Sequence, residues 1–152
     1  MKYIVFALIV IYLISYTNAA AAPAFTLTKE ANNSNELDLL IEGGKDDLYI
    51  VNFYMPGDNH EEVKAELEEK IAGNSKYKDL ATYVEVNAAR TYQYKDVLQD
   101  VGIYNKPSNM YPYVLVIKKG EGYLFRGASI GDLVLKKIAS VVDSKVDFSS
   151  EK

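Results

Sequence analysis

The 152-residue chain contains no cysteine, and this absence excludes several kinds of chemistry at once. Without a thiol the chain has no disulfide, no cysteine nucleophile and no cysteine ligand for zinc. It also has no tryptophan, a single histidine (His60) and no run of more than two Lys or Arg residues. With a formal net charge of −4, it lacks the basic surface that is typical of nucleic-acid binding.

The rest of the composition is that of one globular domain. Hydrophobic residues make up 49% of the chain and charged residues 25%. A chain of this length is long enough to bury one sizeable core and too short for two ordinary domains. We expect the domain to span residues 23–145, followed by a short polar tail at residues 146–152.

Residues 1–22 are typical of a secretory signal peptide. Lys2 precedes an apolar stretch at residues 3–16, and the small residues of TNAAAA at 17–22 suit cleavage. Fourteen helical residues reach roughly 21 Å, less than the hydrocarbon core of about 30 Å. Counted through Ala22 the stretch has twenty residues, so an uncleaved membrane anchor is the alternative.

A signal peptide implies the secretory pathway, with the domain in the lumen of the endoplasmic reticulum or secreted, and an anchor implies a membrane-bound protein. Cysteines are usable as staples or catalysts in such an oxidising compartment, so their absence is informative. The sequence Asn32-Asn33-Ser34 matches the acceptor pattern for N-glycosylation at Asn32.

Strands and helices alternate along the mature chain. Residues 48–54 (LYIVNFY) form a nearly continuous apolar run, typical of a central strand covered on both faces. Val63, Leu67 and Ile71 recur every four residues, which predicts an amphipathic helix. The expected strands lie at residues 25–28, 48–54, 82–88, 113–120 and 122–127, and the expected helices run from an N-cap at Asn35 to Gly43 and over residues 60–73, 94–103 and 130–142. This order predicts an α/β fold, a mixed sheet with helices on both faces.

Three stretches together resemble the thioredoxin fold, and most of all the thioredoxin-like domains of the protein disulfide isomerase family. Residues 53–62 (FYMPGDNHEE) are similar to the family's F-Y-A-P-W-C-G-H-C-K. Tyr111-Pro112-Tyr113 is similar to its Y-P-T, which implies a cis-proline facing the active-site turn. Residues 122–138 (GYLFRGASIGDLVLKKI) resemble its last strand and helix. The resemblance covers residues 25–142.

The resemblance also marks what has been replaced. Asp58 and Glu61 occupy the two cysteine positions, and Asn52 falls where the family places a buried acidic residue that shuttles protons. Residues 104–110 (YNKPSNM) enlarge the loop before Pro112, where the family usually has two residues. Thiol–disulfide exchange requires a thiolate, so we expect a redox-inactive protein that is not an enzyme and needs no cofactor.

The residues at the former redox positions have two interpretations. Asp58 and Glu61 are spaced as a capping box at the start of a helix, with Asp58 accepting from the Glu61 backbone N–H. The alternative is a metal or acid–base site built from Asp58, His60, Glu61 and Glu62. Because four polar residues at a helix start are more often a cap and a solvated face, we favour the cap and expect no metal.

The resemblance implies a binding module, because non-catalytic domains of this family typically bind polypeptide clients or partner subunits. Tyrosines around the enlarged loop suit such a surface, since they offer contact area with a polar tip. The expected binding face consists of residues 55–60, the enlarged loop at 104–110 and residues 111–113. The candidate binding residues on it are Met55, Pro56, Gly57, Asp58, Asn59, His60, Tyr104, Met110, Tyr111, Pro112 and Tyr113. If residues 1–22 are an uncleaved anchor, the alternative is a membrane-anchored structural accessory subunit of a larger complex.

The first testable prediction concerns residues 1–22. We expect intact mass and N-terminal sequencing of the native protein to give a mature start between Ala20 and Ala22, because the small residues there suit cleavage. Carbonate extraction should then release the protein from membranes. A start at Met1, with the protein in the carbonate pellet, would establish the anchor instead.

Overall fold

The computed structural model describes residues 33–43, 47–77 and 79–143. The strand expected at residues 25–28, the N-terminal segment 1–22, Asn32 and the tail at 146–152 lie outside these residues, so the expectations for them stay predictions. No helix within the described ranges is long and apolar enough to cross a membrane.

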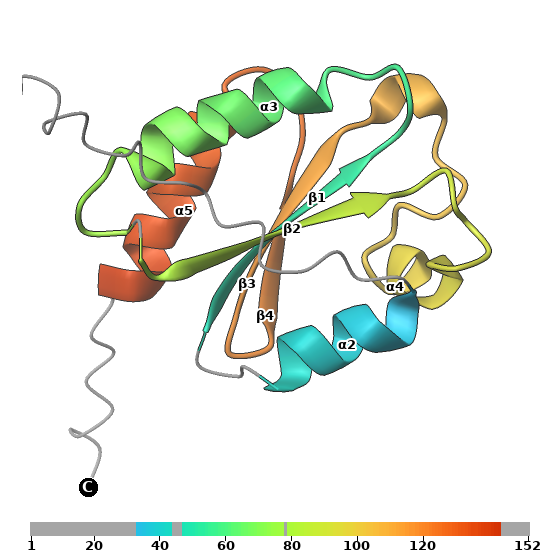
Figure 1. Ribbon diagram of the computed structural model, residues 1–152, viewed down its shortest axis with the longest axis horizontal. Helices are drawn as coiled ribbons and strands as arrows, with labels where there is room; N and C mark the ends of the chain where they lie inside the picture. The colour runs from blue at the N-terminus through green and yellow to red at the C-terminus, as the bar shows by residue number, and fades with distance from the viewer. Residues whose placement is uncertain (1–32, 44–46, 78, 144–152) are drawn as a thin grey trace, which may run out of the picture.

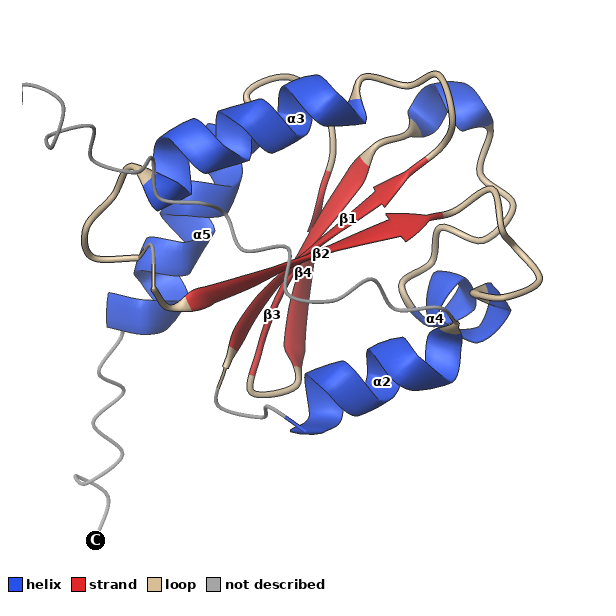
Figure 2. Cartoon of the chain, viewed as in Figure 1, coloured by secondary structure: helices blue, strands red, loops and turns tan. Residues whose placement is uncertain are grey.

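The described residues form a layered α/β structure (Figure 1). Its elements in chain order are α2 (Ser34–Gly43), β1 (Leu48–Tyr54), α3 (His60–Leu67), the π-helical turn η1 (Glu68–Ala72), β2 (Ala81–Asn87), α4 (Lys95–Asp100), the 3₁₀ turn η2 (Ser108–Met110), β3 (Tyr113–Lys118), β4 (Glu121–Phe125) and α5 (Ile130–Asp143). Helices α3 and α5 lie on one side of the sheet, and α2 and α4 on the other (Figure 2).

The four described strands form a mixed sheet in the order β2-β1-β3-β4. Strand β1 runs parallel to β2 and antiparallel to β3, and β3 pairs with β4 as an antiparallel hairpin. A parallel pair needs a crossover connection, and α3 supplies it between β1 and β2. The predicted mixed sheet with helices on both faces is therefore confirmed.

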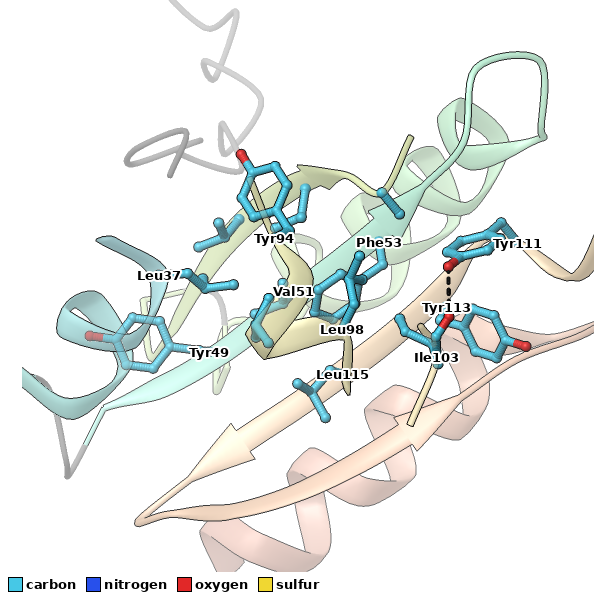
Figure 3. Packing of buried hydrophobic residues seen from close by; sticks show 14 residues of the cluster. Leu37, Tyr49, Val51, Phe53, Tyr94, Leu98, Ile103, Tyr111, Tyr113 and Leu115 are labelled. Carbon is cyan, nitrogen blue, oxygen red and sulfur yellow. Dashed lines mark hydrogen bonds between the residues drawn. The ribbon is translucent and has the colours of Figure 1, made fainter. Parts of the chain in front are cut away.

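Strand β1 is central, and its bounds are those predicted from its apolar run. Every β1 residue except the last, Tyr54, is buried. Because side chains of a strand alternate between faces, Leu48 and Ile50 pack toward α3 and α5, whereas Val51 and Phe53 pack toward α2 and α4. Figure 3 shows the buried side chains on the α2 and α4 side, which pack around Leu98 of α4.

Helix α2 begins earlier than predicted. Asn33, rather than Asn35, caps it, because the Asn33 Oδ1 accepts a hydrogen bond from the Glu36 backbone N–H at 3.0 Å. Ser34 is buried at 4% exposure, and its backbone N–H donates to the Gln93 carbonyl at 2.9 Å. A tertiary contact with the segment before α4 thus fixes where α2 starts.

Turn residues shorten two other predicted elements. The strand expected at residues 113–120 ends at Lys118, because Lys119 and Gly120 adopt positive φ angles of 54° and 78° and form the hairpin turn. The helix expected at residues 94–103 ends at Asp100, and Gly102 follows with a φ of 74°. Such angles lie in the left-handed region, which neither strand nor helix contains.

The structure predicts a clear stability difference between two leucines. Leu67 is fully buried between α3 and the sheet, whereas Leu133 of α5 is 42% exposed. We expect Leu67→Ala to lower the free energy of unfolding by about 2–5 kcal/mol, because it removes core contacts and leaves a cavity. Leu133→Ala is the matched control and should cost less than about 1 kcal/mol. Equal losses in urea denaturation would contradict the described packing.

Candidate functional site

The chain leaves β1 through a tight turn at residues 55–59, where Gly57 has a φ of 88°. The Asp58 carboxylate stabilises this turn by accepting hydrogen bonds from its backbone. The Met55 N–H donates to Asp58 Oδ2 at 2.8 Å and the His60 N–H donates to Asp58 Oδ1 at 3.0 Å. Since the Asp58 side chain is only 5% exposed, these backbone donors replace the water that a carboxylate otherwise needs.

The predicted capping box is wrong. Asn59 is the N-cap of α3, without a side-chain cap bond, so Glu61 occupies the second helical position instead of the third. Asp58 therefore bonds the backbone on either side of the turn and not the Glu61 N–H. The Glu61 side chain is 74% exposed. The Asp58 carboxylate therefore bridges the two ends of the turn, and the Glu61 carboxylate faces solvent.

His60 belongs to the same turn. Its Nδ1 lies 2.7 Å from Asp58 Oδ1, and its Nε2 lies 3.3 Å from Glu61 Oε1. Its ring stacks on Tyr54 with 4.1 Å between ring centroids. In the part of the chain that the structure describes, no three His, Asp or Glu side chains come together as a metal site.

The second part of the site is the enlarged loop at residues 104–110, which we call the strap. It leads through η2 to Tyr111, and the bond between Tyr111 and Pro112 is cis, as the resemblance implies. The strap satisfies much of its own backbone. The Met110 N–H donates to the Pro107 carbonyl at 2.9 Å, and the Tyr111 N–H donates to the Ser108 carbonyl at 3.1 Å.

A side chain from the end of the sheet also bonds the strap. Arg126, directly after β4, donates from Nε to the Met110 carbonyl at 2.6 Å. The same guanidinium lies over the Tyr113 ring, 5.8 Å from its centroid. Both the carbonyl of Met110 and the N–H of Tyr111 are thus already paired at the point where the strap meets the cis-proline.

The turn and the strap enclose an open hollow of about 390 Å³. It is lined by Met55, Pro56, Gly57, Asp58, Asn59, Ser108, Asn109 and Tyr111. All eight lie within the predicted binding face, Ser108 and Asn109 as part of the enlarged loop at residues 104–110. On that loop the sequence singles out Tyr104 and Met110, whereas the structure places Ser108 and Asn109 at the hollow.

Five of the candidate residues do not line the hollow: His60, Tyr104, Met110, Pro112 and Tyr113. Tyr111 and Tyr113 are only 7% and 6% exposed, so they offer little contact surface. They pack edge to face with ring centroids 5.1 Å apart. The Tyr111 hydroxyl donates to the Ile103 carbonyl at 3.0 Å (Figure 3), which anchors it in the core.

Burial also governs how Tyr111 ionises. Its surroundings raise the pKa of the Tyr111 hydroxyl above the ordinary 10.0, chiefly through desolvation and secondarily through Tyr113. The hydroxyl therefore stays protonated and remains a donor to Ile103. This tyrosine supports the floor of the hollow instead of forming an exposed contact.

Asn52 lies at the other notable position, on the central strand beneath α3. It is fully buried, and its Nδ2 donates to the Tyr83 hydroxyl at 2.9 Å. Tyr83 donates in turn to Glu85 Oε1 at 3.1 Å, and Lys64 Nζ pairs with that oxygen at 3.2 Å. A chain of polar contacts thus leads from the core to the surface of α3.

The buried end of this chain of polar contacts lacks one hydrogen bond. Among the described residues, Asn52 Oδ1 is a buried atom without a hydrogen-bond partner. Desolvation raises the pKa of Tyr83 far above 10.0, so its hydroxyl is a proton donor at all physiological pH values. The resemblance places the family's acidic proton relay at position 52. The Asn52 amide found there does not ionise at physiological pH and cannot act as such a relay.

Comparison with known proteins bears on the fold. No protein-family model matches the chain, and no curated protein matches it. In contrast, 224 solved chains match its structure. Reduced thioredoxin pre-protein from Schistosoma mansoni has a TM-score of 0.52 and 22% identity, covering 71% of this chain and 94% of its own.

Two further structures give the same result. Mitochondrial Thioredoxin 3 from Saccharomyces cerevisiae, in its oxidised form, has a TM-score of 0.56 and 16% identity over 76% of this chain and 97% of its own. The fold is thioredoxin-like. The J-Trx1 fragment of ERdj5 matches with a TM-score of 0.51 and 21% identity, over 72% of this chain and 49% of the fragment. Within this fold, the complete lack of cysteine is compatible with a redox-inactive protein.

The burial of Asn52 generates a prediction about pH. In Asn52→Asp the introduced carboxyl would be buried opposite Glu85, its register partner on β2. Both effects raise its folded-state pKa above the unfolded value of about 3.9. The variant should therefore resemble the parent near pH 4 and lose on the order of 3 kcal/mol of stability as the pH rises to 7.

Urea denaturation between pH 4 and pH 8 measures this difference. Asn59→Asp provides the matched control, because Asn59 is exposed at the end of the turn and its new carboxylate stays hydrated. A pH-independent difference between Asn52→Asp and the parent would show that position 52 is not buried as described.

Proposed function

We propose that this chain is a non-catalytic, redox-inactive thioredoxin-fold protein of the secretory pathway that binds polypeptide in the hollow between the turn and the strap. The hollow itself carries the proposal. Its volume of about 390 Å³ lies at the lower end of the range of about 300–1,000 Å³ typical of ligand pockets. The resemblance of the chain to the protein disulfide isomerase family implies that substrate main chain contacts the protein at this place.

The chemistry of the lining supports an uncharged ligand segment. Met55 and Pro56 supply apolar surface above the floor formed by the buried Tyr111, and Asn59, Ser108 and Asn109 supply neutral donors and acceptors. Asp58 is the one charged residue of the lining, and its oxygens are already engaged by the turn. An entering charge would find no partner there, whereas a peptide group with a small apolar side chain would.

The binding mode that we propose depends on side chains. Because the Met110 carbonyl and the Tyr111 N–H are already paired within the protein, a peptide cannot simply add to this segment as an extra strand. The amides of Asn59 and Asn109 and the Ser108 hydroxyl offer hydrogen bonds at the rim instead. The ligand is a client polypeptide or a segment of a partner subunit.

The proposal excludes catalysis by the route that the fold usually serves. Thiol–disulfide exchange needs an attacking thiolate, and this chain has no cysteine. The signal-like residues 1–22 and the resemblance to protein disulfide isomerase domains support the proposed secretory location.

A titration with an unfolded protein tests the proposal. The probe is reduced lactalbumin with its thiols capped by iodoacetamide, added to the ¹⁵N-labelled full-length chain. We expect saturable shifts of the Asn59, Ser108 and Asn109 amide signals. Ser108→Arg should weaken binding about tenfold, because its long side chain would occupy part of the hollow that the ligand needs.

Ser75→Arg is the matched control, because Ser75 is also an exposed serine and lies in the turn after η1, outside the hollow. It should bind the probe as the parent does. Absence of binding, or shifts confined to other surfaces, would refute the proposed function.

A further inference from the structure

The two walls of the hollow are fixed in different ways. The turn at residues 55–59 is held by Asp58, which belongs to the turn itself. The strap is tied from outside, by Arg126, which lies sixteen residues further along the chain from Met110. The first wall is a local structure, whereas the second depends on a contact with the end of the sheet.

The hydrogen bond from Arg126 reaches the part of the strap that lies next to the hollow. Met110 follows Ser108 and Asn109 and precedes Tyr111, and these three neighbours all line the hollow. Met110 itself does not line it, so its carbonyl can accept from Arg126 without blocking the opening. A hydrogen bond with a charged donor at 2.6 Å is among the stronger kinds in proteins.

The aromatic residues beneath Arg126 are buried and packed against each other. Its guanidinium lies over the Tyr113 ring, and Tyr113 is 6% exposed and packs edge to face against Tyr111. Tyr111 is anchored in turn through its hydroxyl to Ile103. Arg126 therefore connects the strap to the buried core on the α2 and α4 side of the sheet.

We propose that Arg126 is the positioning residue of this site: it holds the strap against the sheet and so sets the width of the hollow for its polypeptide ligand. This inference rests on the proposed function for its ligand, but its structural part stands on the Met110 contact. An alternative role for Arg126 makes the opposite prediction for binding. If a ligand N–H instead used the Met110 carbonyl, Arg126 would compete with the ligand, and its removal would tighten binding.

Three variants of Arg126 and one control test the proposal in the full-length chain. Arg126→Gln and Arg126→Ala remove the charged donor, whereas Arg126→Lys keeps a cation and a donor and should rescue in part. Arg90→Gln is the charge-matched control, because Arg90 is exposed in the segment between β2 and α4. Hydrogen exchange is followed at the Met110 and Tyr111 amides, and binding is followed with the capped, reduced lactalbumin.

We expect exchange at both amides to rise about tenfold in Arg126→Gln and Arg126→Ala, since a charge-assisted bond that holds the strap is lost. The affinity for the probe should fall about tenfold. The Tyr113 ring signals should shift while the thermal midpoint stays near that of the parent. Arg126→Lys should lie between, and Arg90→Gln should behave as the parent in every measurement.

The two assays separate the failure of this inference from failure of the proposed function. Unchanged exchange in Arg126→Gln would overturn the inference, whatever the binding. Faster exchange with equal or tighter binding would also overturn it, in favour of a strap that must open or of Arg126 as a competitor. If the parent itself does not bind the probe, the proposed function fails, and the exchange data still decide whether Arg126 holds the strap.

Discussion

The burial of β1 on both faces is the constraint on which the rest of the structure depends. A strand without a solvated side requires helices above and below it, and here α3 with α5 and α2 with α4 provide them. It also fixes where the chain emerges, because the turn at residues 55–59 starts where the cover ends. The site is therefore positioned by a rigid central strand, and its own residues need only shape a turn and a strap.

A carboxylate and an amide stand at two of the positions where the resemblance places redox groups, and both have structural roles. Asp58, at the position where the resemblance places the first cysteine, serves as an acceptor for backbone donors of its turn. Asn52 keeps a polar group at a fully buried position and links it to Tyr83 and, through Glu85, to Lys64. A buried polar group with an unpaired atom lowers the stability of the fold. An apolar residue at position 52 would avoid this cost.

The hollow is made jointly by two segments that are more than forty residues apart in the sequence. Its turn wall is held locally by Asp58 and its strap wall by Arg126. Because much of the strap's backbone is bonded within the protein, recognition at this site would fall to side chains. Loops held on a rigid scaffold are the usual place for binding residues, and the turn and the strap are two such loops.

The sequence by itself determined the order of the elements, the bounds of β1 and the exclusion of thiol chemistry, because apolar periodicity and composition are local properties. The resemblance of short motifs to a known family also indicated the turn and a cis-proline at Pro112, which the structure has. Only the tertiary structure decided that Asn33 and not Asn35 caps α2, that Asp58 clamps its turn, and that Tyr111 and Tyr113 are buried. It likewise brought Ser108 and Asn109 to the hollow. These features depend on contacts between residues distant along the chain, and no local pattern records which partner a side chain will meet.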